Sequence, residues 1–307
     1  MFFKKIIFIV GPTAAGKTEV ACFLAKAING EIISCDAMQV YREVSIANNK
    51  PPKAAFQSIP HHLIGVVSIA EDFDVAIFRK KALATIAAIQ RKKKIPIIVG
   101  GSGLYMKVLL DGIFEGKRKN ARLRARLEKE AETKGSTFLH ERLQKLDPEA
   151  AKKIHPNDMR RIIRALEVCL TTKNPISRLQ KNRQGLWGKF DVRIFALNRD
   201  RPKLYEMINQ RVDKMFLRGI IGEIEGLLKK KWSKTAQSII GVREVTDYLQ
   251  GSHNLEQTKY LMKLKTRRYA KRQLTWFRRE KRLSWLTIGE NDTPKTIVEE
   301  IMRKVRD

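Results

Sequence analysis

Cysteine is scarce in this chain of 307 residues, which has only Cys22, Cys35 and Cys169, and no two of them form a C-x-x-C pair. A small, odd set of scattered thiols is typical of proteins from a reducing compartment. The five histidines form no metal-ligand pattern, and the adjacent His61 and His62 have diverging side chains that do not suit a shared metal ion. The sequence therefore predicts reduced thiols, no metal centre of this kind and a cytoplasmic location.

Long hydrophobic runs are also missing. Near the start, two lysines precede five apolar residues, and Gly11 and Pro12 then interrupt the run. A signal peptide needs a longer apolar core and a small-residue cleavage site. No apolar run approaches the length of a membrane span. We therefore expect a soluble protein with no membrane association.

Acidic residues are few compared with basic ones. The chain has 32 Asp and Glu against 62 Lys and Arg, which gives a net charge of +30. Self-repulsion of this size is tolerated when a polyanion is the usual partner or when salt screens it. Nucleic acid is the first candidate partner. A solubility trait of the source organism and an anionic membrane surface are the alternatives.

Short apolar runs alternate with helix-like segments in the first third of the chain. The expected strands span residues 5–10, 31–34 and 95–99, and the expected helices span 18–28 and 73–91. Strands without polar alternation, separated by helices, indicate a parallel sheet that is covered on both faces. The fold class is therefore α/β.

The pattern changes near residue 117, where the sequence becomes helical and strongly charged. A strand-like run at 192–197 then returns to the sheet, and helices dominate from residue 205, with a possible last strand near 285–288. We expect an α/β core formed by residues 1–116 and 190–307. A helical insertion domain at 117–189 interrupts this core.

A phosphate-binding motif follows the first expected strand. It matches the pattern G-x-x-x-x-G-K-[ST], and its residues are Gly11, Pro12, Thr13, Ala14, Ala15, Gly16, Lys17 and Thr18. Such a P-loop turns backbone N–H groups inward around an anion, and the next helix points its positive end at the same place. Lys17 adds a charge, and the Thr18 hydroxyl is suited to hold Mg²⁺, the cofactor that we expect. The motif predicts binding of a diphosphate or of a nucleotide such as ATP. It leaves kinases, NTPases and transferases with a diphosphate leaving group open.

Two other segments are expected at the same edge of the sheet. Asp36 follows the second strand, where it can accept a proton from a substrate or, equally well, can cap a helix or a turn. Residues 100–105 follow the third strand and bring the Ser102 hydroxyl there. A plain strand-to-helix turn explains this second segment as well as a binding role does.

A cation-rich segment lies near the end of the chain. Residues 265–282 hold nine cations and one acid, and Tyr269, Trp276 and Phe277 stand between the cations. On a helix the aromatic residues can anchor one face while the cations line another. A merely solvated helix would usually carry acids for i,i+4 ion pairs. This segment therefore predicts contact with nucleic-acid phosphates.

These motifs, taken in this order, resemble the tRNA dimethylallyltransferases, also called tRNA isopentenyltransferases. The resemblance covers nearly the whole chain, because further family-specific segments lie between and beyond the motifs. The matching segments are 11–18, 36–41, 60–64, 100–105, 160–167, 210–213, 240–241 and 269–278.

The resemblance implies a reaction and a set of site residues. The P-loop would hold dimethylallyl diphosphate without ATP hydrolysis, and the allyl group would move to the N6 amine of the adenosine on the 3′ side of the anticodon. Asp36 would accept the amine proton, Arg211 would stabilise the leaving diphosphate, and Thr13 and Ser102 would offer hydroxyls. The residues implied for contact with the tRNA anticodon stem-loop are Asp36, Ala37, Met38, Gln39, Ser102, Arg124, Arg160, Arg161, Ile162, Ile163, Arg164, Arg268, Lys271, Arg272 and Gln273. We expect a monomer.

Three positions depart from the usual pattern of the family. Ser102 stands where threonine is common, so the hydroxyl survives. Residues 47–51 read Ala-Asn-Asn-Lys-Pro in place of Gly-Thr-Ala-Lys-Pro, and residues 242–243 read Val-Arg in place of Tyr-Lys. These two changes affect local loop or tRNA detail, and not the reaction.

Three alternatives share parts of these features. An adenylate dimethylallyltransferase would use similar machinery on free AMP, ADP or ATP, but it needs no wide cationic surface. A small-molecule P-loop kinase would share the phosphate cradle and would need an arginine-bearing lid. A non-enzymatic RNA-binding protein has no use for Asp36 beside an intact P-loop.

Overall fold

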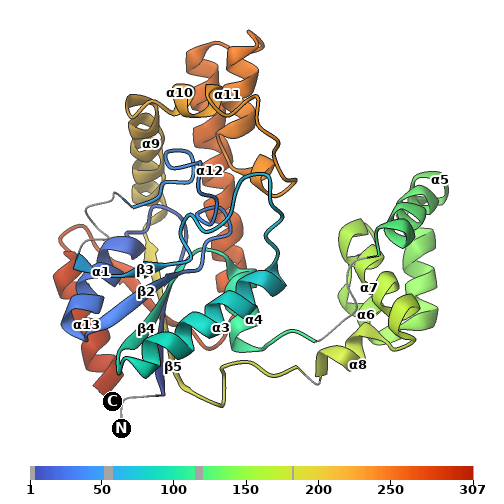
Figure 1. Cartoon of the computed structure of the whole chain (residues 1–307), viewed down its shortest axis with the longest axis horizontal. Coiled ribbons are helices and arrows are strands. Elements are labelled where there is room, and N and C mark those ends of the chain that lie inside the picture. Colours follow the sequence, from blue (N-terminus) through green and yellow to red (C-terminus); the bar gives the residue numbers. More distant parts are fainter. Residues whose placement is uncertain (1–3, 52–57, 115–119, 182, 307) are drawn as a thin grey trace. The chain divides into compact units, whose positions relative to one another are not determined.

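The computed structural model describes residues 4–51, 58–114, 120–181 and 183–306 (Figure 1). The chain divides into two compact units: Met1–Leu110 together with Leu186–Asp307, and Asp111–Gly185. The break points lie a few residues before those expected from the change in sequence pattern. The second unit thus interrupts the chain of the first.

A parallel sheet forms the centre of the first unit. Its order is β3-β2-β4-β1-β5-β6, and every described pair of neighbouring strands is parallel. The bounds are β1 Lys5–Val10, β2 Gly30–Ser34, β3 His61–His62, β4 Ile95–Gly100, β5 Asp191–Arg199 and β6 Ser284–Ile288. The α/β fold with a parallel sheet is confirmed. Only β3 has no counterpart among the expected strands, because a two-residue strand leaves no periodic pattern.

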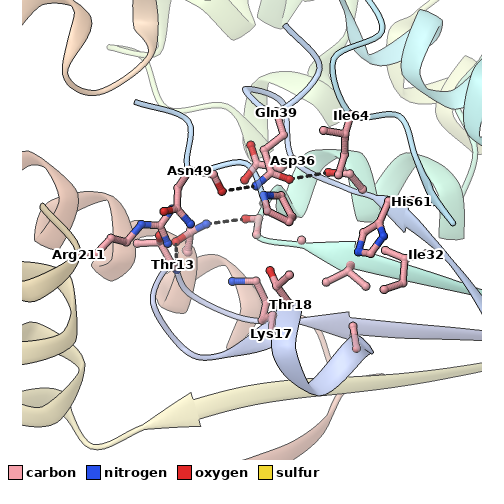
Figure 2. Close-up of a pocket in the computed structure, with 17 residues that line it drawn as sticks. Thr13, Lys17, Thr18, Ile32, Asp36, Gln39, Asn49, His61, Ile64 and Arg211 are labelled. Carbon is pink, nitrogen blue, oxygen red and sulfur yellow. Dashed lines mark hydrogen bonds between the residues drawn. The ribbon is translucent and has the colours of Figure 1, made fainter. Parts of the chain in front are cut away.

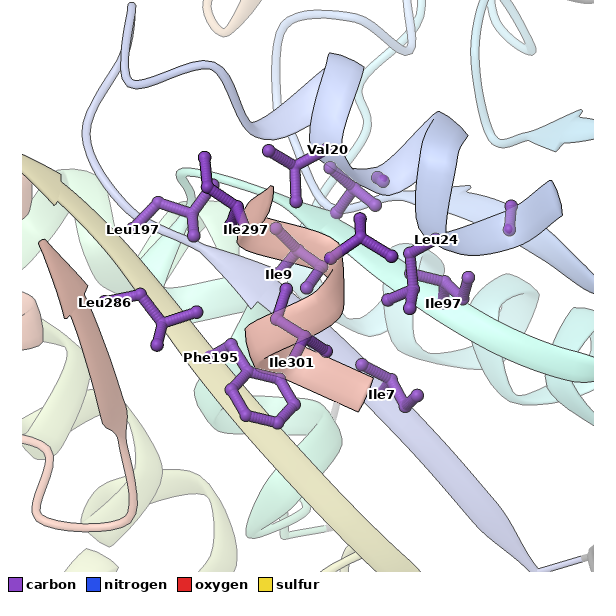
Figure 3. Packing of buried hydrophobic residues seen from close by; sticks show 14 of the residues in the cluster. Ile7, Ile9, Val20, Leu24, Ile97, Phe195, Leu197, Leu286, Ile297 and Ile301 are labelled. Carbon is purple, nitrogen blue, oxygen red and sulfur yellow. The ribbon is translucent and has the colours of Figure 1, made fainter. Parts of the chain in front are cut away.

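Helices cover both faces of this sheet. On one face α1 (Lys17–Ala27) and α13 (Pro294–Arg306) pack together, and Leu24 and Ile301 meet the buried strand residues Ile7 and Ile97 (Figure 3). On the other face lie α3 (Val75–Arg91) and α4 (Gly103–Leu110), with the rings of Phe78 and Tyr105 stacked at 4.0 Å. Burial on both faces is why the strands read as continuous apolar runs.

A group of helices lies beyond the carboxyl ends of the strands (Figure 1). It comprises α9 (Arg201–Leu217), α10 (Ile220–Glu225), the short 3₁₀ helix η1 (Ala236–Ser238), α11 (Val242–Leu249) and α12 (Leu255–Phe277). Leu204 and Ile208 of α9 pack on Ala270 of α12. Ligands of open α/β sheets bind at the carboxyl ends of the strands, so a site at that edge of the sheet would be bordered by these helices.

The second unit is helical. It contains α5 (Ala121–Leu146), α6 (Pro148–Lys153), α7 (Met159–Thr172) and α8 (Ile176–Lys181), and Gly135 (φ 82°) interrupts the helical backbone within α5. Leu127 and Leu139 pack against Ile162 and Leu166 in its core. Across the described residues of both units, no helix has the length and apolar character that a membrane crossing requires.

Candidate active site

The P-loop closes tightly against the neighbouring strands. Gly11 has a φ of +141°, and a Cβ there would lie 2.4 Å from the carbonyl oxygen of Leu197 at the end of β5, so only glycine fits. α1 begins at Lys17, directly after Gly16, so the positive end of the helix points into the loop. This geometry is the one in which backbone N–H groups surround a phosphate group.

A small cavity of about 60 Å³ opens above the P-loop (Figure 2). Lys17 and Thr18 line it from below, Asp36 and Gln39 line it from the loop after β2, and Arg211 reaches it from α9. Lys17 Nζ donates to the carbonyl oxygen of Pro12 at 2.6 Å. The structure therefore brings together Thr13, Lys17, Thr18 and Arg211, which sequence and resemblance assigned to the donor; Ser102, which the resemblance also assigned to it, is not among the residues that line this cavity.

Asp36 lies in a turn and caps no helix, because residues 35–40 are not helical. Its Oδ1 accepts a hydrogen bond from the backbone N–H of Met38 at 2.9 Å. The carboxylate also lines two adjacent cavities. One oxygen thus braces the turn, as the turn interpretation expected, while the group remains accessible to a ligand.

Ser102 fixes the loop that carries Asp36. Its hydroxyl oxygen accepts from the backbone N–H of Ala37 at 3.1 Å, and its own N–H donates to the carbonyl of Cys35 at 3.3 Å. Burial raises the pKa of Tyr269, the negative charge of Asp36 adds to this, and a side-chain hydrogen bond with Ser102 opposes it. Ser102 therefore joins the ends of β2 and β4 to α12.

Gln273 has a different position from the one expected for a tRNA-contacting residue. It is buried, its Oε1 accepts from the backbone N–H of Thr13 at 2.8 Å, and its Nε2 donates to the carbonyl of Gly101 at 2.9 Å. A Cβ at Gly101 would lie 2.1 Å from this Nε2. The side chain therefore ties the P-loop to the glycine-rich loop after β4 and is not part of a basic surface.

A second cavity, of about 300 Å³, adjoins the first. Thr13, Asp36 and Arg211 line both. The remaining wall is largely apolar, and its apolar residues include Ala47, Met215, Ile239, Ile240 and Met262. Met38 and Arg272, which the resemblance assigned to tRNA contact, line this cavity too, as does Tyr269. Ala47, Ile239 and Ile240 lie in loops, and Met215 and Met262 lie on two different helices, so no local pattern marked the five as one binding wall.

Positive charge dominates where the two cavities meet. Burial and repulsion from Arg211 lower the pKa of Lys17 to about 7, and attraction to Asp36 opposes this only in part. Burial also lowers the pKa of Arg211, again against the pull of Asp36. Two partly buried cations thus share one carboxylate. A ligand with negative charge would stabilise both cations in their charged forms.

Several residues expected to touch tRNA belong to the helical unit, and the structure divides them into three groups. Ile162 and Ile163 are buried in its core, so their side chains do not form a nucleic-acid surface, which corrects that expectation. Arg160 and Arg161 are exposed at the start of α7. Arg124 and Arg164 point to a shared acid.

That acid is Glu167, whose side chain is only 1% exposed. Arg124 donates to both of its oxygens, at 2.9 and 2.7 Å, and Arg164 donates at 2.6 Å. The backbone N–H of Asn120 donates to it as well, at 2.7 Å. These two arginines therefore hold the helical unit together. The sequence gave no signal of the Arg124 contact because its partner is 43 residues away, whereas Arg164 and Glu167 are an i,i+3 pair on one helix.

The cation-rich part of α12 presents an exposed surface. Arg268, Lys271 and Arg272 are exposed, whereas Ala270 and Phe277 are buried against the rest of the unit. The guanidinium of Arg272 lies 5.7 Å from the ring centre of Tyr269, which lines the second cavity. Arg268 and Lys271 therefore lie away from the buried face that Ala270 and Phe277 form, as the pattern predicted, whereas Arg272 lies beside Tyr269 at the second cavity.

The chain is similar to proteins of one kind. Residues 39–280 match the family described as IPP transferase. The chain is 44% identical over 301 residues to a tRNA dimethylallyltransferase of Carboxydothermus hydrogenoformans, covering 97% of this chain and 96% of that protein. It is 41% identical over 303 residues to the protein of that name in Alkaliphilus oremlandii, covering 98% and 96%.

Solved structures give the same result. A tRNA isopentenylpyrophosphate transferase from Bacillus halodurans is 37% identical, with a TM-score of 0.73 and coverage of 99% of this chain and 96% of that one. A eukaryotic dimethylallyltransferase acting on tRNA is 29% identical, with a TM-score of 0.84 and coverage of 98% and 80%.

Proposed function

Because the chain belongs to the IPP transferase family, we propose that it transfers a dimethylallyl group from dimethylallyl diphosphate to the N6 amine of the adenosine on the 3′ side of a tRNA anticodon. The observation that carries this proposal is the position of Asp36 and Arg211, which line both the cavity above the P-loop and the larger cavity beside it. A donor in one cavity and an adenine in the other would meet at these two side chains.

In the donor half of the site, positive charge would bind the diphosphate. The diphosphate would lie in the P-loop, with Lys17 and Arg211 against its oxygens and the amino end of α1 below it. When the allylic C–O bond breaks, negative charge grows on the diphosphate, and groups already in place stabilise it without reorganisation. We propose that the cradle serves this leaving group and that no ATP is hydrolysed.

Mg²⁺ fits the residues at the same place. Magnesium is usually held by one or two protein oxygens together with phosphate oxygens. Thr18 offers a hydroxyl at the cavity, and Ser34 and Asp36 offer further oxygen atoms to it. When bound, the ion would supply additional positive charge for the diphosphate. Thr18 is the residue that we propose holds it.

The acceptor half needs a base, because the exocyclic amine of adenine is a weak nucleophile. Its nitrogen lone pair forms a bond to the terminal allylic carbon as the bond from that carbon to the diphosphate oxygen breaks. The nitrogen then carries a positive charge and loses a proton, which the Asp36 carboxylate accepts. The products are N6-dimethylallyladenosine and diphosphate. To reach a recessed donor, the adenine must leave its stack.

The surface for the rest of the tRNA is proposed from charge and exposure. Arg268, Lys271 and Arg272 are exposed on α12, and Arg160 and Arg161 are exposed in the helical unit. Such cations bind backbone phosphates without reading sequence. We propose that these five residues contact the anticodon stem-loop, and that Asp36, Ala37 and Met38 lie at the target base.

One assay tests the proposed function. The protein is incubated with Mg²⁺, radiolabelled dimethylallyl diphosphate and either an anticodon stem-loop or AMP. We expect label in the RNA and none in AMP. The matched control is the same stem-loop with guanosine at the target position, which lacks the N6 amine and should take no label.

Other outcomes identify the alternatives. Label that enters only AMP would indicate an adenylate dimethylallyltransferase. Phosphate transfer from ATP to a small molecule would indicate a kinase. Relatives that match along nearly the whole chain are tRNA dimethylallyltransferases, which argues against both.

A further inference from the structure

A carboxylate outside both cavities holds the loop that forms part of their walls. Glu223 Oε1 accepts from the backbone N–H groups of Ser45 and Ile46, at 2.6 and 2.7 Å. Its Oε2 accepts from those of Ile46 and Ala47, at 3.0 and 2.9 Å. Three successive backbone amides that converge on one point form an anion-binding nest. Here a side chain of the same protein fills the nest.

The loop held in this way continues to the catalytic turn. The side-chain amide of Asn48 donates to the carbonyl of Met38 at 3.0 Å, and Gln39 donates to the carbonyl of Asn49 at 3.1 Å. Met38 in turn donates its backbone N–H to Asp36 at 2.9 Å. Hydrogen bonds, joined by the peptide link from Ala47 to Asn48 and by the backbone of Met38, therefore connect Glu223 to the carboxylate of Asp36.

The same loop forms cavity walls. Ala47 and Asn48 line the larger cavity, and Asn49 lines the smaller one. A displacement of residues 45–49 would change the space opposite Asp36 and Arg211. Glu223 is on α10, which directly follows the Arg211-bearing helix α9 and packs against it.

We infer that Glu223 is a positioning residue for prenyl transfer, acting on Asp36 and on the acceptor wall through the loop 45–49. The reaction in this inference is the proposed function, and the structural argument is the set of hydrogen bonds that Glu223 accepts. Glu223 is not among the residues that line the two cavities, and its carboxylate binds three backbone amides. Its removal should therefore slow the transfer step more than it weakens donor binding.

The test compares Glu223→Ala with Glu225→Ala, a control at an exposed residue of the same helix. For Glu223→Ala we expect kcat with the stem-loop to fall about 10- to 100-fold, the size of loss that a small misplacement of reacting groups produces. The Kd for dimethylallyl diphosphate should change by less than about threefold. Glu225→Ala should match the wild type in both.

Acetate supplies a readout that a merely structural residue would not give. The empty nest in Glu223→Ala should accept a small carboxylate, so added acetate should restore much of the lost kcat, while chloride at the same ionic strength should not. Amide hydrogen exchange at residues 45–47 should be faster in the variant and slower again with acetate. If Glu223→Ala does not fold, the same measurements are made on Glu223→Gln, which keeps the size of the side chain and removes its charge.

The outcomes separate this inference from the proposed function. If the wild type transfers no prenyl group, the proposed function fails, whereas hydrogen exchange still reports on the nest. If the wild type is active and both Glu223 variants stay within about threefold of it, the positioning role is overturned. A loss of kcat that acetate does not restore, with unchanged exchange at 45–47, overturns it too.

Discussion

The backbone N–H of Thr13, in the P-loop, donates to the side-chain oxygen of Gln273, in α12, at 2.8 Å. The same side chain donates to Gly101 at 2.9 Å. One glutamine near the end of the chain thus sets the distance between two loops at the carboxyl edge of the sheet. The phosphate cradle is therefore a tertiary structure and not only a local motif.

The first prediction concerns this contact. Gln273→Ala leaves the N–H of Thr13 and the carbonyl of Gly101 without their partner, and each such buried group costs about 1–3 kcal/mol. The free energy of unfolding should fall by that order, and the affinity for dimethylallyl diphosphate should fall about tenfold or more. Denaturant unfolding and calorimetric titration measure the two effects. Thr275→Ala, at an exposed position of the same helix, should change neither, and equal effects in both variants would contradict the role of Gln273.

The second prediction concerns proton transfer by Asp36. Asn in its place can still accept the hydrogen bond from Met38, so the turn should persist. It cannot accept the amine proton, and a general base contributes about 10²- to 10⁴-fold. For Asp36→Asn we expect normal melting and near-normal binding of both substrates, with kcat reduced by about two orders of magnitude or more. A near-normal kcat would leave Asp36 with the role of a turn residue alone.

The third prediction is a pH dependence of donor binding. The pKa of Lys17 is about 7 in the free protein, because of burial and the nearby Arg211. A bound diphosphate favours the charged amine and raises this pKa, so binding takes up a proton at a pH above about 7. As far as Lys17 is concerned, affinity should be highest below about pH 7 and should fall toward higher pH, by at most about tenfold per pH unit.

Titration calorimetry in two buffers of different ionisation enthalpy measures this proton uptake. Lys17→Met keeps the length of the side chain and removes the ionisable group, so its weaker binding should not depend on pH in this range. Proton uptake of equal size in this variant would assign the effect to another group.

The fourth prediction concerns Glu167. Burial by itself raises the pKa of this carboxyl, but hydrogen bonds from Arg124 and Arg164 outweigh it and hold the pKa at about 2. The usual value in an unfolded chain is about 4.3. The ionised group therefore stabilises the helical unit fully above about pH 4.3, and this stability is lost as the pH falls toward 2.

Glu167→Gln should lower the free energy of unfolding by about 3 kcal/mol at neutral pH, because it leaves two arginines without their acid. Circular dichroism during urea unfolding measures the loss, and the variant should also lose less stability on acidification. Glu132→Gln, at an exposed position of α5, is the control. If the tRNA role expected for Arg124 were its main one, Glu167→Gln would leave stability unchanged.

The fifth prediction concerns the exposed cations of α12. Replacing Arg268 and Lys271 together by alanine should weaken binding of the stem-loop and should reduce the slope of log K against log salt by about 1.4–1.8 if each contacts one phosphate. Filter binding over a range of salt concentrations gives the slope. Replacing Lys80 and Lys81, exposed on α3, provides a control with the same change in net charge. An identical slope in all three proteins would place the RNA elsewhere.

The sequence by itself determined the parts of this protein that depend on neighbouring residues. Lys5–Val10, the glycines of the P-loop and the helix that begins at Lys17 form one local unit. The runs at 95–99 and 192–197, apolar except for Arg193, became buried strands because they lack a regularly polar face. The exposed positions of Arg268 and Lys271 and the buried position of Phe277 on α12 follow from helical spacing in the same way.

Only the tertiary structure decided what depends on residues that are distant in the chain. Nothing near Gln273 indicates that it binds Thr13, and nothing near Arg124 indicates that Glu167 binds it. The hydrogen bonds of Glu223 to residues 45–47 and the position of Asp36 between two cavities also depend on residues that are distant in the chain. The spacing of apolar and polar residues indicates whether a side chain is buried or exposed. Its hydrogen-bond partner is set only when the sheet, its loops and the helices above them have packed together.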